Sequence, residues 1–148
     1  MKKRLFFITV VMLLKLTVVT AQSNLRQGSS GYSSILYNWD GQSLRQGSSK
    51  YSEVIANWDG QYIRQGSSQY SKVLYNWDGQ YLRQGESSYG AILYNWDGKN
   101  IRSGKSQYNS VLYNYDGKSV RRGASSYSDV LYNTEGKFLI AILIYIIE

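Results

Sequence analysis

The sequence predicts an all-β fold made of six tandem 19-residue repeats, each folded as a two-stranded β-hairpin. Three observations lead to this prediction: a fixed 19-residue period, one turn signature in every period, and no convincing helical periodicity within residues 25–137. Twelve short strands in one flat sheet would leave two open edges and an exposed apolar face. We therefore expect the hairpins to close into a ring or to coil into a superhelix, with a parallel β-solenoid as the alternative.

The first 21 residues have the layout of a targeting segment. A basic head at residues 2–4 precedes an apolar run over residues 5–14, and small residues end at Ala21. This order predicts a secretory signal peptide over residues 1–21 and an exported protein, with a retained N-terminal anchor as the alternative. The segment holds four basic residues and no acid, so its removal lowers the net charge from +7 to +3. So small a charge argues against a nucleic-acid partner.

The repeated unit fills residues 25–137 and reads roughly L-R-Q-G-S-S-x-Y-S-x-V-L-Y-N-W-D-G-x-x. Several residue types recur at the 19-residue spacing in all six copies. They are the arginines at 26, 45, 64, 83, 102 and 121, the tyrosines at 32, 51, 70, 89, 108 and 127, the asparagines at 38, 57, 76, 95, 114 and 133, and glycines two residues after each arginine and three after each asparagine. Six copies at one spacing exclude chance.

Each repeat carries one hairpin turn. In the first copy, residues 38–41 read Asn-Trp-Asp-Gly, the preference pattern of a type I turn followed by a left-handed glycine. This three-residue loop predicts that Leu36 lies opposite Leu44. A two-residue Asp-Gly loop, the alternative, would instead pair Tyr37 with Leu44. The second connection, at residues 47–50, is small and polar as a turn requires.

The spacing of the arginines favours antiparallel hairpins over the solenoid. In a parallel solenoid, equivalent residues stack about 4.8 Å apart, so six arginines would need anions between them. In an array with two strands per repeat the separation is about twice as large. Aspartates could neutralise either arrangement, so the choice stays open in favour of the hairpins.

The C-terminal segment departs from the repeat. Residues 138–147 form an apolar run. A helix that spans a bilayer needs roughly 20 residues, so this run is too short to do so. The isoleucine-rich, unalternating run predicts a capping strand over residues 138–148, buried on both faces as a plug of the repeat core. The alternative is a contact with a membrane or partner, including self-association through residues 138–147.

The composition excludes most site chemistry. The chain has no histidine and no cysteine, which removes imidazole bases, thiolate nucleophiles and the usual zinc ligands. We therefore expect no enzyme, no cofactor and no metal. The repeated aspartates are expected to cap turn amides, and the arginines to pair with them or to stack on aromatic rings inside the fold.

Aromatic residues at the turns are the candidate ligand-binding residues. They occupy the second position of the first five predicted turns, where side chains usually protrude, and polar Asn, Asp and Arg flank them. Stacking on the apolar face of a sugar uses these residue types, and repeated weak sites gain avidity on a polymer. The candidates are Trp39, Trp58, Trp77, Trp96 and Tyr115. An inter-repeat ladder of packed rings is the alternative.

The stretch from Tyr37 to Gly47, Tyr-Asn-Trp-Asp-Gly-Gln-Ser-Leu-Arg-Gln-Gly, resembles the short aromatic hairpin repeats of choline-binding and other cell-wall-binding modules. The resemblance extends over residues 25–137, although the Gly-Trp dipeptide of those modules is absent. It implies a superhelix of hairpins that hold ligands between aromatic side chains of adjacent repeats.

These observations predict an exported, non-catalytic binding or surface-interaction protein, with a polysaccharide or cell-wall glycan as the leading ligand. The alternative is a structural or self-assembling β-repeat protein in which the aromatic residues form the core and no small ligand binds.

Overall fold

The structure, a computed structural model, describes residues 21–148, so the predicted signal peptide lies outside the described residues apart from Ala21. Twelve β-strands precede a single helix in this part of the chain. The strands are β1 (Ser23–Gln27), β2 (Ile35–Trp39), β3 (Ser43–Gln46), β4 (Val54–Trp58), β5 (Tyr62–Gln65), β6 (Val73–Trp77), β7 (Tyr81–Gln84), β8 (Ile92–Trp96), β9 (Asn100–Ser103), β10 (Val111–Tyr115), β11 (Ser119–Arg122) and β12 (Val130–Glu135).

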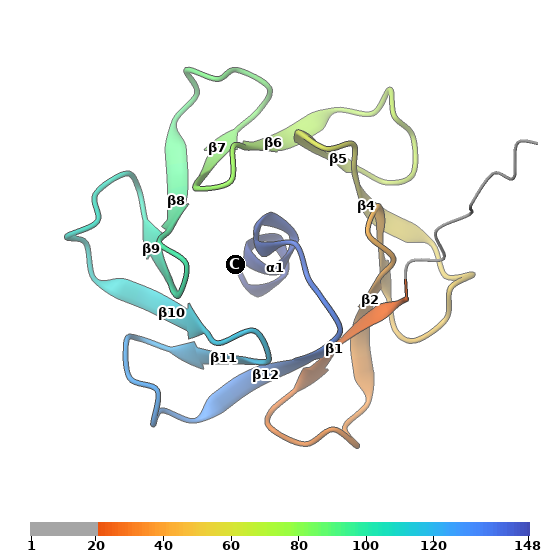
Figure 1. Cartoon of the computed structure of the whole chain (residues 1–148). Helices are drawn as coiled ribbons and strands as arrows, with labels where there is room; N and C mark the ends of the chain where they lie inside the picture. Colours follow the sequence, from red (N-terminus) through yellow and green to blue (C-terminus); the bar gives the residue numbers. More distant parts are fainter. Residues whose placement is uncertain (1–20) are drawn as a thin grey trace, which may run out of the picture.

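The strands form one closed antiparallel barrel in which each strand pairs with its neighbours in sequence (Figure 1). The first strand closes the ring on the last, with Leu25 opposite Thr134. Closure removes both open edges, which is the reason we expected a closed array. The prediction of an all-β array of antiparallel hairpin repeats is confirmed, and the parallel solenoid is not supported.

The hairpin turns use neither predicted register. Leu44 pairs with Trp39, because the loop consists of only two residues, 41 and 42, closed by the Asp40 amide donating to the Ser43 carbonyl at 3.3 Å. Gly41 has φ 95°, as a primed hairpin turn requires at its first central position. The carboxylate of Asp40 accepts hydrogen bonds from the amides of Gln42 and Ser43, so aspartate opens the turn and Trp39 belongs to the strand.

The two faces of the barrel wall are chemically distinct. One buried aliphatic residue per repeat faces the lumen, each at most 1% exposed: Leu25, Leu44, Ile63, Leu82, Ile101 and Val120. The aromatic residues of the even-numbered strands pack on the same core, whereas the asparagines and arginines paired across the hairpins, such as Asn38 and Arg45, face outward. The alternation follows from the period of two in a strand.

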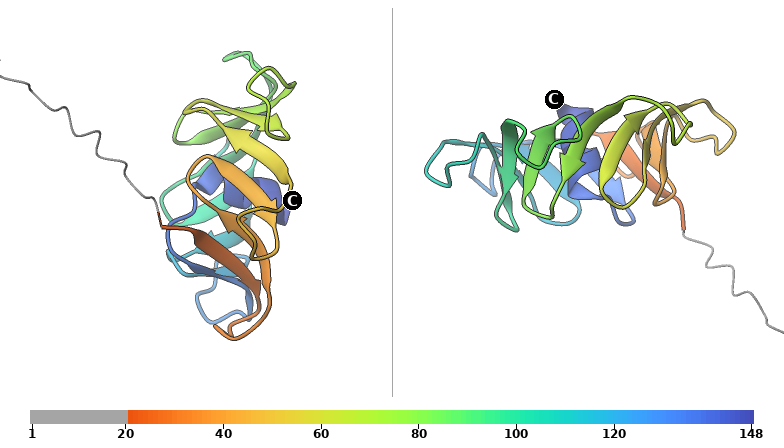
Figure 2. Two further views of the ribbon diagram at one scale, coloured as in Figure 1. Left: turned by 90° about the vertical axis from the view of Figure 1, so that its right-hand side faces the viewer. Right: turned by 90° about the horizontal axis from the view of Figure 1, so that it is seen from above.

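The lumen is filled by helix α1 (Ile140–Ile147), which lies inside the ring in every view (Figures 1 and 2). The predicted capping strand over residues 138–148 is therefore wrong in its secondary structure. A closed barrel offers no free edge for another strand, whereas a helix pairs its own backbone groups and presents apolar side chains all round. Ala141, Ile142, Leu143 and Ile144 are fully buried against the barrel wall.

Within residues 21–148, α1 is too short for a helical membrane span.

Candidate functional site

The candidate site is built from six outer loops that project from the barrel between its hairpins (Figure 1). They span residues 28–34, 47–53, 66–72, 85–91, 104–110 and 123–129. Each loop presents one tyrosine, and these six side chains are 86% to 102% exposed: Tyr32, Tyr51, Tyr70, Tyr89, Tyr108 and Tyr127. Large aromatic side chains at six equivalent, fully exposed positions contribute nothing to the core.

A buried asparagine anchors each outer loop. The side-chain amide of Asn38 donates to the carbonyls of Gly47 and Ser49, at 2.7 and 3.2 Å. Gly47, at φ 74°, starts the loop by donating its amide to the Leu36 carbonyl at 2.7 Å. The Ser49 hydroxyl then accepts from the Tyr51 amide at 3.1 Å. The tyrosine is therefore held on an ordered turn, and the same bonds recur in the other repeats.

The carboxylate of each hairpin turn is paired with an arginine on the outer wall. Asp40 pairs with Arg45, and Asp116 with Arg121, both at 2.7 Å. Burial raises the pKa of Asp116, but the hydrogen bonds from Arg121 and from two backbone amides together outweigh burial. The pKa of Asp116 is therefore lowered, to about 2. The pKa of Asp97 is also lowered, where Arg102 and Asn100 outweigh the effect of burial. The turn carboxylates therefore stay ionised, as the turn-capping prediction requires.

An outer groove lies between a hairpin turn and the outer loop beside it. In its best-formed copy the groove encloses about 510 Å³ and is lined by Gln80, Tyr81, Asn95, Asp97, Lys105, Ser106, Gln107 and Tyr108. A groove of about 310 Å³ lies at the equivalent position two repeats further on, lined by Arg26, Gly31, Lys118, Asn133, Thr134 and Glu135. The outer groove therefore recurs at two positions of the ring, and the smaller copy has no tyrosine in its lining.

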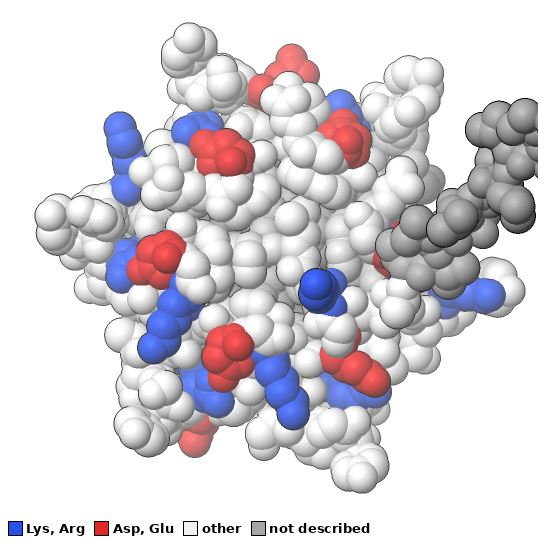
Figure 3. All heavy atoms as spheres, in the orientation of Figure 1, with Lys and Arg blue, Asp and Glu red and all other residues white. Residues whose placement is uncertain are grey.

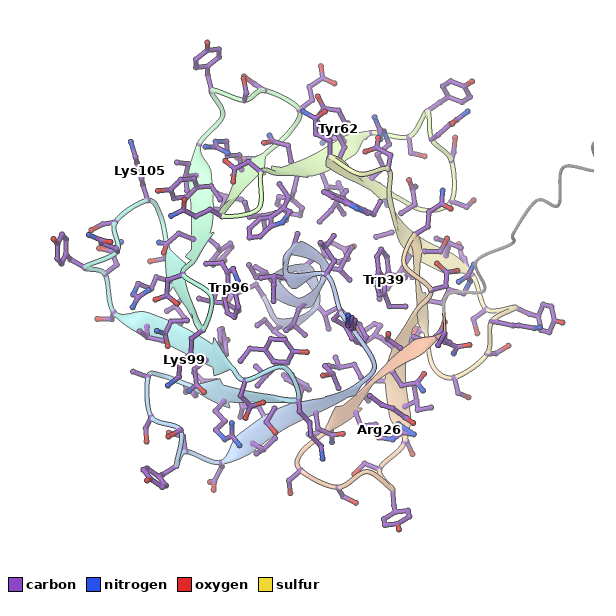
Figure 4. The ribbon with its side chains drawn as sticks, in the orientation of Figure 1. Arg26, Trp39, Tyr62, Trp96, Lys99 and Lys105 are labelled. Atoms are coloured by element: carbon purple, nitrogen blue, oxygen red, sulfur yellow. The ribbon has the colours of Figure 1, made fainter. Side chains whose placement is uncertain are left out.

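The groove brings aromatic and polar groups together. Tyr81 starts strand β7 on the outer wall, and the guanidinium of Arg83 lies over its ring at 5.3 Å. Arg64 covers the ring of Tyr62 in the same way at 5.1 Å. Figure 4 shows the outer-loop side chains, Lys105 among them, pointing away from the barrel. Hydrogen-bonding groups thus lie beside a half-buried ring on the outer wall.

The sequence-predicted binding residues lie elsewhere. Trp39 is 3% and Tyr115 7% exposed, and Trp58, Trp77 and Trp96 are half-buried against the core. The ring of Trp96 lies 6.5 Å from that of Tyr115, and both labelled tryptophans point toward α1 in Figure 4. The expectation that these side chains protrude is wrong, because they end a strand and face the lumen. Ligand binding by them stays a prediction.

Sequence reasoning missed the six exposed tyrosines as site residues. They belong to the 19-residue period, but each lies just before an apolar strand segment, and tyrosine is ordinary in a strand. The neighbouring serines were the available signal, because Ser-Ser before Tyr favours a turn in which the hydroxyl accepts a backbone amide.

The comparison with known families identifies the architecture. The model of the family described as "6-fold beta flower protein" matches residues 25–143, so the chain belongs to this family. The predicted kinship with choline-binding and cell-wall-binding hairpin modules is therefore wrong. Those modules shared only a short aromatic and glycine pattern with this chain. No curated protein and no solved structure shows significant similarity to it.

Proposed function

We propose that this protein is an exported, non-catalytic binding protein whose outer grooves hold the repeating units of a polysaccharide or cell-wall glycan. The observation that carries the proposal is the exposure of six equivalent tyrosines on ordered loops. Exposing large rings to water brings no stability, so their repetition favours a contact with something outside the chain. Export rests on the sequence of residues 1–21 alone.

The chemistry of the groove fits a sugar better than an apolar ligand. Tyr108 offers a ring for the apolar face of a pyranose, while Asn95, Gln80 and Gln107 offer amides to its hydroxyls. The volume of the groove lies within the range of about 300–1,000 Å³ for small-molecule sites. The proposal therefore assigns stacking to the outer-loop tyrosines instead of to the lumen tryptophans.

The arrangement of the carboxylates favours binding over catalysis. Glycoside hydrolysis uses two carboxyl groups, one of them protonated at working pH. Asp97 is the one carboxylate lining the groove, its pKa is lowered, and Arg102 is bound to it at 2.5 Å. A paired carboxylate that is ionised at neutral pH can accept hydrogen bonds from hydroxyls but is a poor proton donor.

Six equivalent outer loops on one ring, each with an exposed tyrosine, suit a repetitive ligand. Single sugar-stacking contacts are weak, but a polymer that reaches two or more grooves gains effective concentration for each further contact. A self-assembling role through residues 138–147 has less support, because Ala141, Ile142, Leu143 and Ile144 are buried in the lumen.

Binding to insoluble polysaccharides and peptidoglycan tests the proposal. We expect the full chain to co-sediment with at least one of them, and a variant with all six outer-loop tyrosines changed to serine to lose this binding. The matching tyrosine-to-phenylalanine variant keeps the rings and should retain most of the affinity. Absence of binding to every glycan, or equal binding by the serine variant, would contradict the proposal.

A further inference from the structure

The end of the barrel that carries the hairpin turns, here called the turn end, has an uneven charge. The residue after each turn glycine is glutamine in the first three repeats and lysine in the last three. All six side chains are exposed: Gln42, Gln61, Gln80, Lys99, Lys118 and Lys137. Figure 3 views this end, where the inner blue side chains lie over the part of the ring that contains β9–β12 and beside its centre. Three lysines, the lysine arc, therefore occupy one half of the turn end.

The lysine arc carries surplus charge. Each turn carboxylate beside it is bound by an arginine: Asp97 by Arg102, Asp116 by Arg121, and Glu135 by Arg26. No ion pair joins any of the three lysines to an acid within residues 21–148. Successive lysines lie two strands apart, roughly 10 Å, which is close to the screening length in physiological salt. They therefore act together on an anionic surface.

The fold does not require lysine at these positions. The carbonyl of Lys99 accepts the amide of Tyr115 at 2.9 Å, and that of Gln42 accepts the amide of Trp58 at 2.8 Å. The side chain is free in both cases, so glutamine and lysine fill the same structural position. Packing of the fold therefore does not explain why these three positions carry lysine.

The chain also enters the barrel at the turn end. Ser23 pairs with Trp39 at the start of β1, and its hydroxyl donates to the Lys137 carbonyl at 2.9 Å. The sequence before Ser23 contains the apolar run of residues 5–14 and four basic residues. If that run is retained as an anchor, it joins the fold beside the lysine arc. If it is removed after Ala21, the new ammonium group of Gln22 adds a fourth cation there.

We propose that the turn end is a docking face for a membrane surface that carries anionic phospholipid headgroups. A flat ring end, three unpaired lysines and the entry of the chain all lie on this one face. Each lysine near an anionic bilayer raises partitioning roughly fivefold, so the arc contributes on the order of 100-fold. When this end lies on the bilayer, the outer loops project sideways from the barrel and remain free to meet a glycan above the membrane surface.

Vesicle co-sedimentation of the full chain tests this proposal, with phosphatidylcholine vesicles that contain or lack phosphatidylglycerol. Binding to the neutral vesicles measures the contribution of the apolar residues within 1–20. The difference in binding between the two vesicle compositions measures the contribution of charge. We expect preferential binding to the anionic vesicles that salt weakens. The variant K99Q/K118Q/K137Q should lose this preference on the order of 100-fold.

A second triple variant, K50Q/K72Q/K105Q, removes the same charge from exposed outer-loop positions and should keep most of the preference. Equal losses in the two triple variants would overturn the proposal, as would equal binding to both vesicle types. Binding to soluble polyphosphate without binding to anionic vesicles would assign the arc to a free polymer and also overturn it. The glycan pull-down compares the full chain with tyrosine variants that keep every lysine, so the two proposals fail separately.

Discussion

The ring of Tyr145 meets that of Tyr75 edge-on, with 6.1 Å between the ring centroids and 63° between their planes. Five repeats place a tyrosine at this position of the lumen wall, whereas the second repeat has Ala56: Tyr37, Tyr75, Tyr94, Tyr113 and Tyr132. The electrostatic neighbours of Tyr145 are Tyr75 and Tyr37, from the repeats on either side of Ala56. The helix therefore supplies the sixth tyrosine, and one departure from the repeat fixes how it is rotated in a nearly six-fold lumen.

Filling the position of Ala56 should displace the helix. We expect A56Y to lower the free energy of unfolding by about 1–3 kcal/mol, because overpacking forces side chains off their rotamers. Removing the competing ring with Y145A in the same chain should recover part of that loss. Urea unfolding of the two single variants and the double variant measures the coupling. Strictly additive effects would show that the two side chains do not share one space.

The asparagine under each outer loop should control the order of that loop. N95A removes the donor to the carbonyls of Gly104 and Ser106, now at 2.7 and 3.3 Å, and leaves both in a partly buried site. We expect a loss of about 1–3 kcal/mol and faster amide exchange within residues 104–110. N109A, which removes an exposed asparagine in the same loop, is the matched control. Unchanged exchange in N95A would rule out the anchoring role.

Stability should fall in acid because the turn carboxylates titrate at lower pH in the fold than in the unfolded chain. The pKa of Asp116 is about 2 in the fold, against 3.8 normally. Its contribution is complete above the unfolded value and disappears as the pH falls through the folded value. Urea midpoints between about pH 5 and pH 2 should decrease steadily. D116N, which keeps an oxygen for the turn amides, should flatten this decrease in part, and an unaltered slope would contradict the pairing.

The phenol of Tyr94 should ionise late. Burial, followed by the hydrogen bond from its hydroxyl to the Glu148 carboxylate at 2.8 Å, raises its pKa to about 12. Because the folded value lies above the unfolded one, the associated stability is complete below pH 10 and is lost as the pH rises toward 12. Carbon NMR of the tyrosine ring follows this titration. E148Q removes the charge and should bring the pKa of Tyr94 back toward 10.

The repeat made most of the fold predictable, and local chemistry decided the rest. Six similar turn signatures, each running from Asn to Gly over four residues, indicated hairpins, and the need to pair the outer strands indicated closure. The register was wrong because the Asp40 side chain captures two amides and draws the turn one residue past Trp39. Residues 140–147 form a helix because closure left no edge to pair, a condition that exists only in the assembled ring.

The candidate site was less predictable than the fold. Trp39 would protrude if it lay in the turn, but as the last residue of a strand it faces the lumen. A shift of one residue in the strand register reverses the side on which a side chain lies. The exposed tyrosines could be distinguished from strand tyrosines only by the serine that binds the Tyr51 amide. Grooves between a turn and an outer loop arise from residues of adjacent repeats, so no single repeat displays them.

Calorimetric titration of a polysaccharide that binds, compared with its short oligosaccharide, tests the central claim of repeated glycan-binding grooves most directly. Variants with none, two, four or all six outer-loop tyrosines changed to serine provide the series. We expect polymer affinity to fall steeply with each pair removed, while oligosaccharide binding loses sites in proportion and keeps its intrinsic affinity. Polymer affinity that is independent of the number of tyrosines would contradict the account.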